Sequence, residues 1–325
     1  MKRALLALLA AALPTLADVG TEHFFTNALA VAEGATSAAG TFDVYNYTDG
    51  KTGFTLYNGG YVSEIVTGAT GLGRHWQPFL TNGYLSVFNQ MSTENRNKVG
   101  ILTAGAACRL MLGSRVPDTK GTYYTLFRPR TDLDWNFTHR NTLWGFGHTG
   151  YSTLRCWKDK NSDDLLLDYT VKSGTPGNEH YVVAIDPGEN GWKNGVWYLV
   201  AASFPGVSGA DANAQARFWM RELDPRGTEF SPAPIVGVPR TGSDYVSYWP
   251  TAKQDNGKSC AFGSNCRMGL GAYLYNPGDN AGLIDGLGGD ICYFRAENQY
   301  LDYSDFNDFF LSLGRPPDST VVLFR

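Results

Sequence analysis

Short runs of apolar, β-branched and aromatic residues recur along this chain, and turn-forming residues separate them. Runs of this kind between Gly, Asn, Asp and Pro predict β-strands. The predicted strands are 42–47, 54–57, 84–88, 123–128, 143–146, 152–157, 165–171, 180–185, 197–204 and 217–223. The apolar stretch 101–112, interrupted by Gly105, predicts one bent strand or two strands.

The run 197–204 carries apolar residues on both faces of an extended chain. Trp197, Leu199 and Ala201 share one face, and Tyr198 and Val200 share the other. Because a strand with one wet face alternates apolar and polar residues, this pattern predicts a central strand that is covered on both sides.

Beyond the N-terminus, helical spacing is found at 304–313, with apolar residues at Phe306, Phe309, Phe310 and Leu313. The spacing of turns favours a sandwich over alternating strands and helices, and no repeat of propeller period is present. We therefore expect an all-β fold: a two-sheet antiparallel jelly-roll sandwich with a short C-terminal helix.

Composition agrees with many strands joined by many turns. Of the 325 residues, 14% are aromatic and 18% charged, and 38 are glycine. The formal net charge is −4 and the basic residues are scattered. Without a basic patch, the chain has no electrostatic attraction for nucleic acid or an anionic membrane, so a nucleic-acid partner is not expected.

The first residues resemble a secretory signal peptide in their layout. Lys2 and Arg3 form a positive start, 4–13 is an apolar run too short to span a bilayer, and small residues follow Pro14. We predict cleavage after Ala17; the alternative is an N-terminal core helix. The expected organisation is a signal peptide at 1–17 and a single jelly-roll domain at 18–325, in which 18–100 is an N-terminal extension that contributes strands. No later segment is apolar enough to span a membrane, so we expect a secreted protein, or a periplasmic one in a Gram-negative host.

Five cysteines fit an exported protein. Cys260 and Cys266 enclose a short loop and are predicted to form a disulfide. Cys108 and Cys156 are a candidate second bridge, and Cys292 is predicted to be a buried free thiol. No C-x-x-C pair supports a zinc site.

Residues 123–313 resemble a laminin-G-like domain of the concanavalin A-like lectin/glucanase superfamily. The resemblance is carried by the segments 124–130, 141–147, 194–203 (Asn-Gly-Val-Trp-Tyr-Leu-Val-Ala-Ala-Ser) and 289–296, which occur in the family's order. It implies a sandwich that presents loops or a sheet face to glycans or proteins, sometimes with bound calcium. The segment 41–88 fits the family poorly.

Two aromatic and polar segments, 132–139 and 244–249, have the composition of a sugar site, because sugar rings have apolar faces and polar rims. The candidate ligand-binding residues are Trp135, His139, Tyr245, Tyr248 and Trp249. Alternatively, these aromatic rings plug loops against the core. The candidate calcium ligands are Asp132, Asp134, Asp163 and Asp164, with a solvated acidic turn as the alternative.

Polysaccharide cleavage is the other class of function to weigh. The paired carboxylates of a retaining glycosidase, at E-x-D-x-E or E-x-D-x-x-E spacing, are absent from the sequence. A lyase needs a group that neutralises a uronate and a Tyr or His that moves a proton. Residues on neighbouring predicted strands that could line one face for this are Arg128, Arg130, His148, Tyr151 and Arg155; corner and turn roles are the alternative.

The sequence therefore predicts a secreted, lectin-like or adhesive protein that binds a polysaccharide or glycan, with a non-catalytic role favoured. The alternative is a polysaccharide lyase on the same scaffold. A purely structural role without a small ligand is a third possibility, because the fold does not choose among these.

Overall fold

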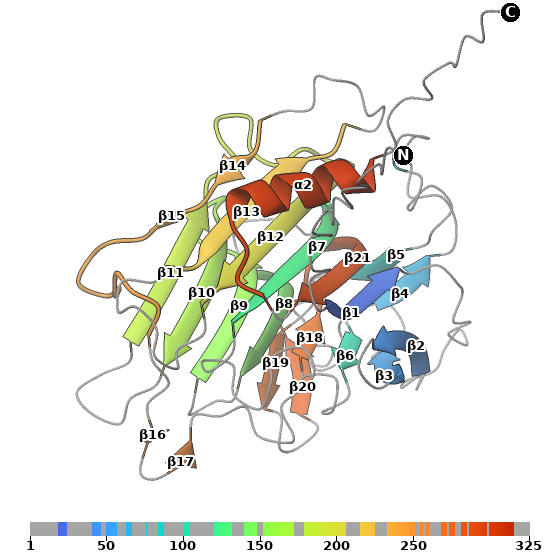
Figure 1. Ribbon diagram of the computed structural model, residues 1–325, viewed down its shortest axis with the longest axis horizontal. Coiled ribbons are helices and arrows are strands. Elements are labelled where there is room, and N and C mark those ends of the chain that lie inside the picture. Colours follow the sequence, from blue (N-terminus) through green and yellow to red (C-terminus); the bar gives the residue numbers. More distant parts are fainter. Residues whose placement is uncertain are drawn as a thin grey trace, which may run out of the picture.

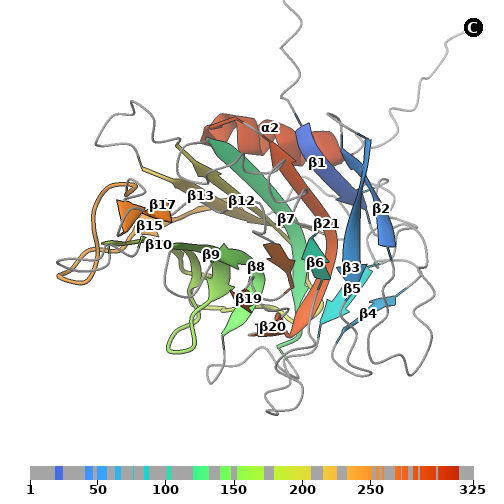
Figure 2. The same ribbon diagram turned by 90° about the horizontal axis from the view of Figure 1, so that it is seen from below.

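The computed structural model describes 120–131, 140–147, 152–171, 179–205, 215–224, 233–250, 286–297 and 299–314, together with Trp76 and the backbone of the strands outside these ranges that are named below. Within this part of the chain, two antiparallel sheets face each other, and a single α-helix lies on the outside of one of them (Figure 1, Figure 2). The all-β sandwich with a short C-terminal helix is confirmed.

The first sheet runs, in spatial order, through β13 (Arg217–Glu222), β12 (Tyr198–Phe204), β7 (Gly121–Pro129), β21 (Gly289–Glu297) and β5 (Tyr84–Val87). Strand β1 (Val19–Phe24) pairs with β21 beside β5. The second sheet runs through β11 (Glu179–Ile185), β10 (Leu165–Val171), β9 (Ser152–Lys158), β8 (Asn141–Gly147) and β18 (Met268–Leu270).

Further short strands connect the two sheets or form small hairpins. Pairing continues from β1 through β2 (Thr41–Asn46), β3 (Gly50–Leu56) and β6 (Ile101–Thr103) to β18, so both sheets belong to one hydrogen-bonded network. Strand β4 (Ser63–Val66) pairs with β5. The hairpins are β16 (Gln254–Asp255) with β17 (Lys258–Ser259), and β19 (Tyr273–Asn276) with β20 (Ala281–Ile284).

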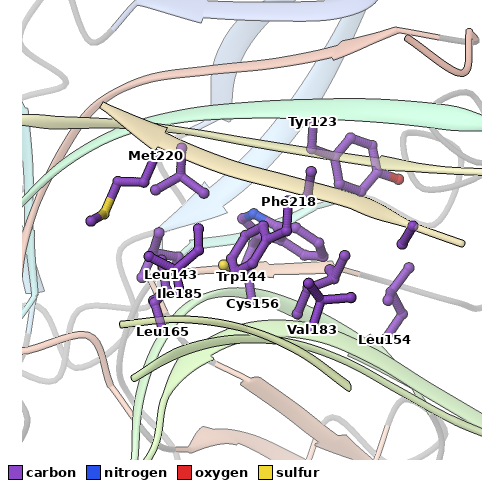
Figure 3. Close-up of a cluster of buried hydrophobic side chains, with 14 of the residues drawn as sticks. Tyr123, Leu143, Trp144, Leu154, Cys156, Leu165, Val183, Ile185, Phe218 and Met220 are labelled. Atoms are coloured by element: carbon purple, nitrogen blue, oxygen red, sulfur yellow. The ribbon is translucent and has the colours of Figure 1, made fainter. Parts of the chain in front are cut away.

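The main core lies between the two sheets. Figure 3 shows Tyr123, Phe218 and Met220 of the first sheet opposite Leu154, Cys156, Leu165 and Val183 of the second. These side chains come from alternate positions of their strands, because successive residues of a strand point to opposite faces.

The central strand β12 is buried on both faces, as its sequence predicts. Val200 and Ala202 face the second sheet, whereas Leu199 and Ala201 face outward into a second apolar cluster. Helix α2 (Tyr303–Leu313) covers that cluster. The predicted strand 197–204 is therefore confirmed, except that Trp197 precedes the strand.

Helix α2 confirms the predicted helix at 304–313. It begins at a capping box, in which Asp302 accepts from the amide of Asp305 and the Asp305 side chain accepts from the amide of Asp302. Phe306 and Phe310 meet the Trp219 ring of β13 at centroid distances of 6.2 and 6.1 Å. Burying a Phe side chain in this way contributes about 1.5–3 kcal/mol, so the helix is held mainly by its apolar face.

The cysteine predictions have different outcomes. Cys292 is buried and free, as expected. The proposed bridge between Cys108 and Cys156 is wrong, because the Cys156 thiol is free and fully buried on the inward face of β9. Cys108, Cys260 and Cys266 lie outside the described residues.

No helix in the described part of the chain is long and apolar enough to cross a membrane.

One short segment pairs with both sheets at the side of β13 and β11. Strand β14 (Ile235–Val236) pairs with β13, and β15 (Val238–Pro239) pairs with β11. Gly237 stands between them, and its amide donates to the Phe218 carbonyl at 2.7 Å. A Cβ at this position would lie 2.8 Å from Val183 Cγ1 and 3.0 Å from Phe218 Cβ, so the close approach requires glycine.

We therefore expect Gly237→Ala to destabilise the protein by about 1–3 kcal/mol through overpacking. Thermal or denaturant unfolding measures the change. Val238→Ala is the matched control, because Val238 is 67% exposed and its truncation should leave stability nearly unchanged. Equal unfolding midpoints for Gly237→Ala and the parent would contradict this account of the junction.

Candidate functional site

A group of polar and aromatic side chains lies on the outer face of the second sheet. On β10, Leu165, Leu167 and Tyr169 point into the core, so the residues between them point away from it. The outward positions hold a small cluster of buried apolar side chains, Trp157, Leu166 and Val182, with Asp168 among them. This face is on the opposite side of the molecule from α2 (Figure 2). We call it the Asp168 face.

Asp168 is fully buried and is the centre of the group. Its Oδ2 accepts from Arg155 Nε at 3.0 Å, Arg155 Nη2 at 2.8 Å and Trp157 Nε1 at 3.1 Å. Its Oδ1 accepts from Thr170 Oγ1 at 3.1 Å and lies 2.9 Å from His180 Nε2. Because these contacts occupy both oxygens, Asp168 positions its neighbours and is unsuited to bind a metal or a sugar hydroxyl itself.

The electrostatics of Asp168 follow from these contacts. Burial by itself raises the pKa of a carboxyl group, but here the Arg155 charge and the hydrogen bond from His180 outweigh burial. The pKa of Asp168 is therefore held well below its usual range. A buried carboxylate that is ionised and fully hydrogen-bonded holds Arg155 and His180 in fixed positions.

Loop residues 240–250 bring the ring of Tyr245 to this face. The Val246 amide donates to the His180 carbonyl at 2.9 Å, which ties the loop to β11. Tyr245 packs against the apolar cluster, and its ring lies 5.2 Å from the His180 imidazole at 39°. Tyr248 is exposed, and its hydroxyl lies 3.4 Å from Glu179 Oε1.

Two guanidinium groups meet the Trp157 ring. Arg155 Cζ lies 4.5 Å from the ring centroid, and Arg140 Cζ lies 5.0 Å from it. The side chains of Arg155 and His180 are 15% and 33% exposed. The Asp168 face thus presents a guanidinium, an imidazole and aromatic rings to solvent around a buried carboxylate.

The residues proposed for a lyase do not line one face. Arg128 and Arg130 both pair with Asp290, at 2.7 and 3.1 Å, on the outer face of the first sheet. Arg155 lies on the outer face of the second sheet, so the prediction of a shared face is wrong. The cause is strand pairing: β7 and β9 belong to different sheets. His148 and Tyr151 lie outside the described residues.

The carboxylates of Asp163 and Asp164 lie close to positively charged side chains of the same chain. The Lys158 ammonium, 1% exposed, donates to the carbonyls of Asp159 and Ser162 at 3.1 Å and lies 3.7 Å from Asp163 Oδ1. Arg240 lies 2.7 Å from Asp164 Oδ2.

Because internal ammonium and guanidinium groups already compensate these carboxylates, the turn does not fit calcium. Across the described residues, no group of three or more His, Cys, Asp and Glu could hold a metal ion. Asp132 and Asp134 lie outside the described residues.

The predicted sugar-binding aromatic residues separate in the structure. Tyr245 lies at the Asp168 face, whereas the Tyr248 hydroxyl contacts Glu179, which lies on the other face of β11 from His180. Trp249 is 5% exposed and belongs to the core, where it stacks on Tyr169 and Phe204 at centroid distances of 4.4 and 5.5 Å. The prediction that Trp249 binds a ligand is therefore wrong, because neither face of its ring is open to a sugar. Trp135 and His139 lie outside the described residues.

Three residues of this face, Trp157, Asp168 and His180, were not predicted. One signal could have found Asp168: it is the single charged residue in the run Leu-Leu-Leu-Asp-Tyr-Thr-Val at 165–171. A carboxylate inside a buried strand needs donors, because an unpaired buried charge is strongly unfavourable. His180 and Trp157 carry no comparable signal, since both residue types are common in ordinary strands.

Comparisons with known proteins leave the family open, because neither a family model nor a curated protein matches the chain. Solved structures match weakly. They include the binding domain of botulinum neurotoxin DC in complex with SialylT (TM-score 0.37, 11% identity, 81% of this chain and 48% of that one). A Trypanosoma rangeli sialidase in complex with sialic acid matches with a TM-score of 0.41 and 10% identity, over 92% of this chain and 34% of the sialidase. A PL-14 alginate lyase from Aplysia kurodai matches with a TM-score of 0.35 and 9% identity, over 68% of this chain and 84% of the lyase.

The chain thus spans about half or less of the first matched structures. At TM-scores below 0.5, these matches carry no argument about function. The resemblance to laminin-G-like domains stays a prediction, and the function is argued below from the residues themselves.

The pKa of Asp168 leads to a test of its structural role. Since folding lowers this pKa, ionised Asp168 stabilises the fold above its unfolded value, near 3.8, and this contribution is lost as the pH falls through the lower folded value. We expect Asp168→Asn to destabilise the protein by about 3–5 kcal/mol at neutral pH, because it breaks a buried pair.

Denaturant unfolding at several pH values measures this, and the difference from the parent should shrink below about pH 4. Asp308→Asn on the exposed side of α2 is the control and should change stability by less than about 1 kcal/mol. A difference that stays constant down to the lowest pH would show that the Asp168 charge does not matter.

Proposed function

We propose that this protein is a secreted, lectin-like carbohydrate-binding protein that uses the Asp168 face to bind a polysaccharide or glycan. The observation that carries the proposal is the place of Tyr245. Its loop has the composition of a sugar site, and its ring centroid lies 5.2 Å from that of His180, which contacts the same carboxylate as Arg155. Aromatic rings beside fixed polar groups suit a sugar, which has apolar faces and a polar rim.

The arrangement is prepared for binding before a ligand arrives. Arg155 and His180 are fixed by Asp168, and Tyr245 is held by the packing of its loop on β11. Side chains that are already ordered lose little further entropy on binding, which favours affinity. Export is part of the proposal and rests on the leader at 1–17.

The role of Tyr245 can be tested by affinity gel electrophoresis of the full chain on gels that contain soluble polysaccharides. We expect Tyr245→Ala to weaken retardation by about tenfold in dissociation constant, through loss of aromatic contact. Tyr300→Ala is the matched control, because Tyr300 packs against Arg217 at the other sheet. If Tyr245→Ala is retarded like the parent, the sugar does not contact this ring.

A polysaccharide lyase is the second candidate, and one contact favours it. His180 Nε2 lies 2.9 Å from Asp168 Oδ1, so that when Nε2–H donates to this carboxylate the lone pair of the neutral ring is on Nδ1. Such a histidine can take the C5 proton of a uronate while Arg155 compensates the charge that develops on the carboxylate; the C–H electron pair then forms the C4–C5 double bond, the C4–O bond breaks, and the departing oxygen takes a proton from water. A rise in ultraviolet absorbance on incubation with a uronate polymer, lost in His180→Gln, would establish the lyase and replace the binding-only function.

A further inference from the structure

We infer that the ligand of the Asp168 face is an acidic glycan, and that a sugar carboxylate binds at Arg155 and His180. This inference rests on the proposed function and adds the chemical class of the sugar. It follows from which groups at the centre of the face reach solvent.

The carboxylate at the centre of the face is not available as an acceptor for a ligand. Both oxygens of Asp168 are occupied by five contacts from Arg155, Trp157, Thr170 and His180. Lectin sites for neutral sugars need carboxylate or amide oxygens that accept from hydroxyl groups, and Asp168 cannot serve in this way. What reaches solvent at the centre is the Arg155 guanidinium and the His180 ring.

The charge around this centre also suits an anion. Arg140 brings a second guanidinium to the Trp157 ring that Arg155 contacts. Two acidic groups of the β9–β10 turn are paired with a cation, because Arg240 lies 3.3 Å from Asp159 Oδ2 and 2.7 Å from Asp164 Oδ2. A carboxylate is the ligand group that fits a planar guanidinium best, because it can accept two parallel hydrogen bonds.

The geometry of His180 supports the same assignment. Its Nε2 is turned toward Asp168, and among the described residues no hydrogen-bond partner is found for Nδ1. A ring that carries protons on both nitrogens donates from Nε2 to Asp168 and from Nδ1 to a bound anion. Arg155 and His180 share one carboxylate, so both donors stand side by side at the surface of β9 to β11.

The opposite sheet offers a matched comparison. There Arg128 pairs with buried Asp290 at 2.7 Å, and its Cζ lies 4.7 Å from the Trp197 ring. The second oxygen of the Asp290 carboxylate pairs with Arg130. At the Asp168 face, the second oxygen of the carboxylate contacts His180 instead. Arg128→Gln therefore removes the same kind of ion pair and the same kind of ring contact from the other side of the molecule.

The experiment is affinity gel electrophoresis of the full chain with four probes: polygalacturonate, its methyl ester, alginate and dextran sulfate. We expect retardation by a polyuronate, and no retardation by the methyl ester, whose carboxylates are neutral. Arg155→Gln and His180→Gln should each weaken binding by about tenfold or more, since charge-assisted bonds are lost. Arg128→Gln should bind like the parent.

His180→Gln keeps an amide donor within reach of Asp168, so it serves as the variant that preserves the fold if Arg155→Gln unfolds. Circular dichroism and the unfolding midpoint check each protein before the gels are run. Equal retardation by polygalacturonate and its methyl ester would overturn the inference, as would binding to dextran sulfate alone, or to neither polyuronate.

The proposed function and the acidic class of the sugar can be disproved separately. Binding to a neutral glycan that Tyr245→Ala weakens and Arg155→Gln leaves intact would retain the proposed function and remove the acidic class. Absence of binding to every glycan tested, charged or neutral, would remove both.

Discussion

The architecture depends on two neighbouring strands, β7 and β12, whose faces are apolar on both sides. Val200 and Phe127 face the second sheet, while Leu199 and Leu126 face outward. Each face must be covered, because apolar surface left in water forfeits the main force that drives folding. The second sheet covers one side and α2 covers the other. That cover closes the outer apolar cluster of the first sheet. In the described part of the chain no helix covers the outer face of the second sheet, where Tyr245, His180 and Arg155 come together.

Buried carboxylates organise the polar parts of both outer faces. Asp168 and Asp290 each stand opposite an arginine in the neighbouring strand, Arg155 and Arg128, and each pair lies beside a tryptophan ring. A buried charge is tolerated when it is paired and hydrogen-bonded, and removing one partner is then strongly unfavourable. The two faces differ in the third partner: a histidine completes the group at Asp168, and a second arginine completes the one at Asp290.

The strands and the helix could be predicted because their signals are local. Alternating apolar residues indicated β12, and the spacing of Phe306, Phe310 and Leu313 indicated α2. Strand pairing between distant parts of the chain could not be predicted. Arg128 and Asp290, which form an ion pair, are 162 positions apart in the sequence. The residues of a strand also do not determine by themselves to which sheet the strand belongs. The site was found in part. Tyr245 and Arg155 stood out by composition, whereas His180 becomes notable only beside Asp168, and Trp249 shows that an aromatic loop residue can equally fill the core.

The short segment that pairs with both β13 and β11 also limits how two molecules could associate through their sheet edges. Strand edges carry backbone amides and carbonyls that can pair with another chain, and natural sheets cover such edges to avoid aggregation. Residues 235–239 occupy part of the edge of both sheets at once, with backbone pairing at Ile235–Val236 and Val238–Pro239. Pro239 adds a residue that cannot donate from its nitrogen. At this side of the sandwich, the same five residues thus occupy backbone groups of two sheet edges that a strand of a neighbouring molecule could otherwise pair with.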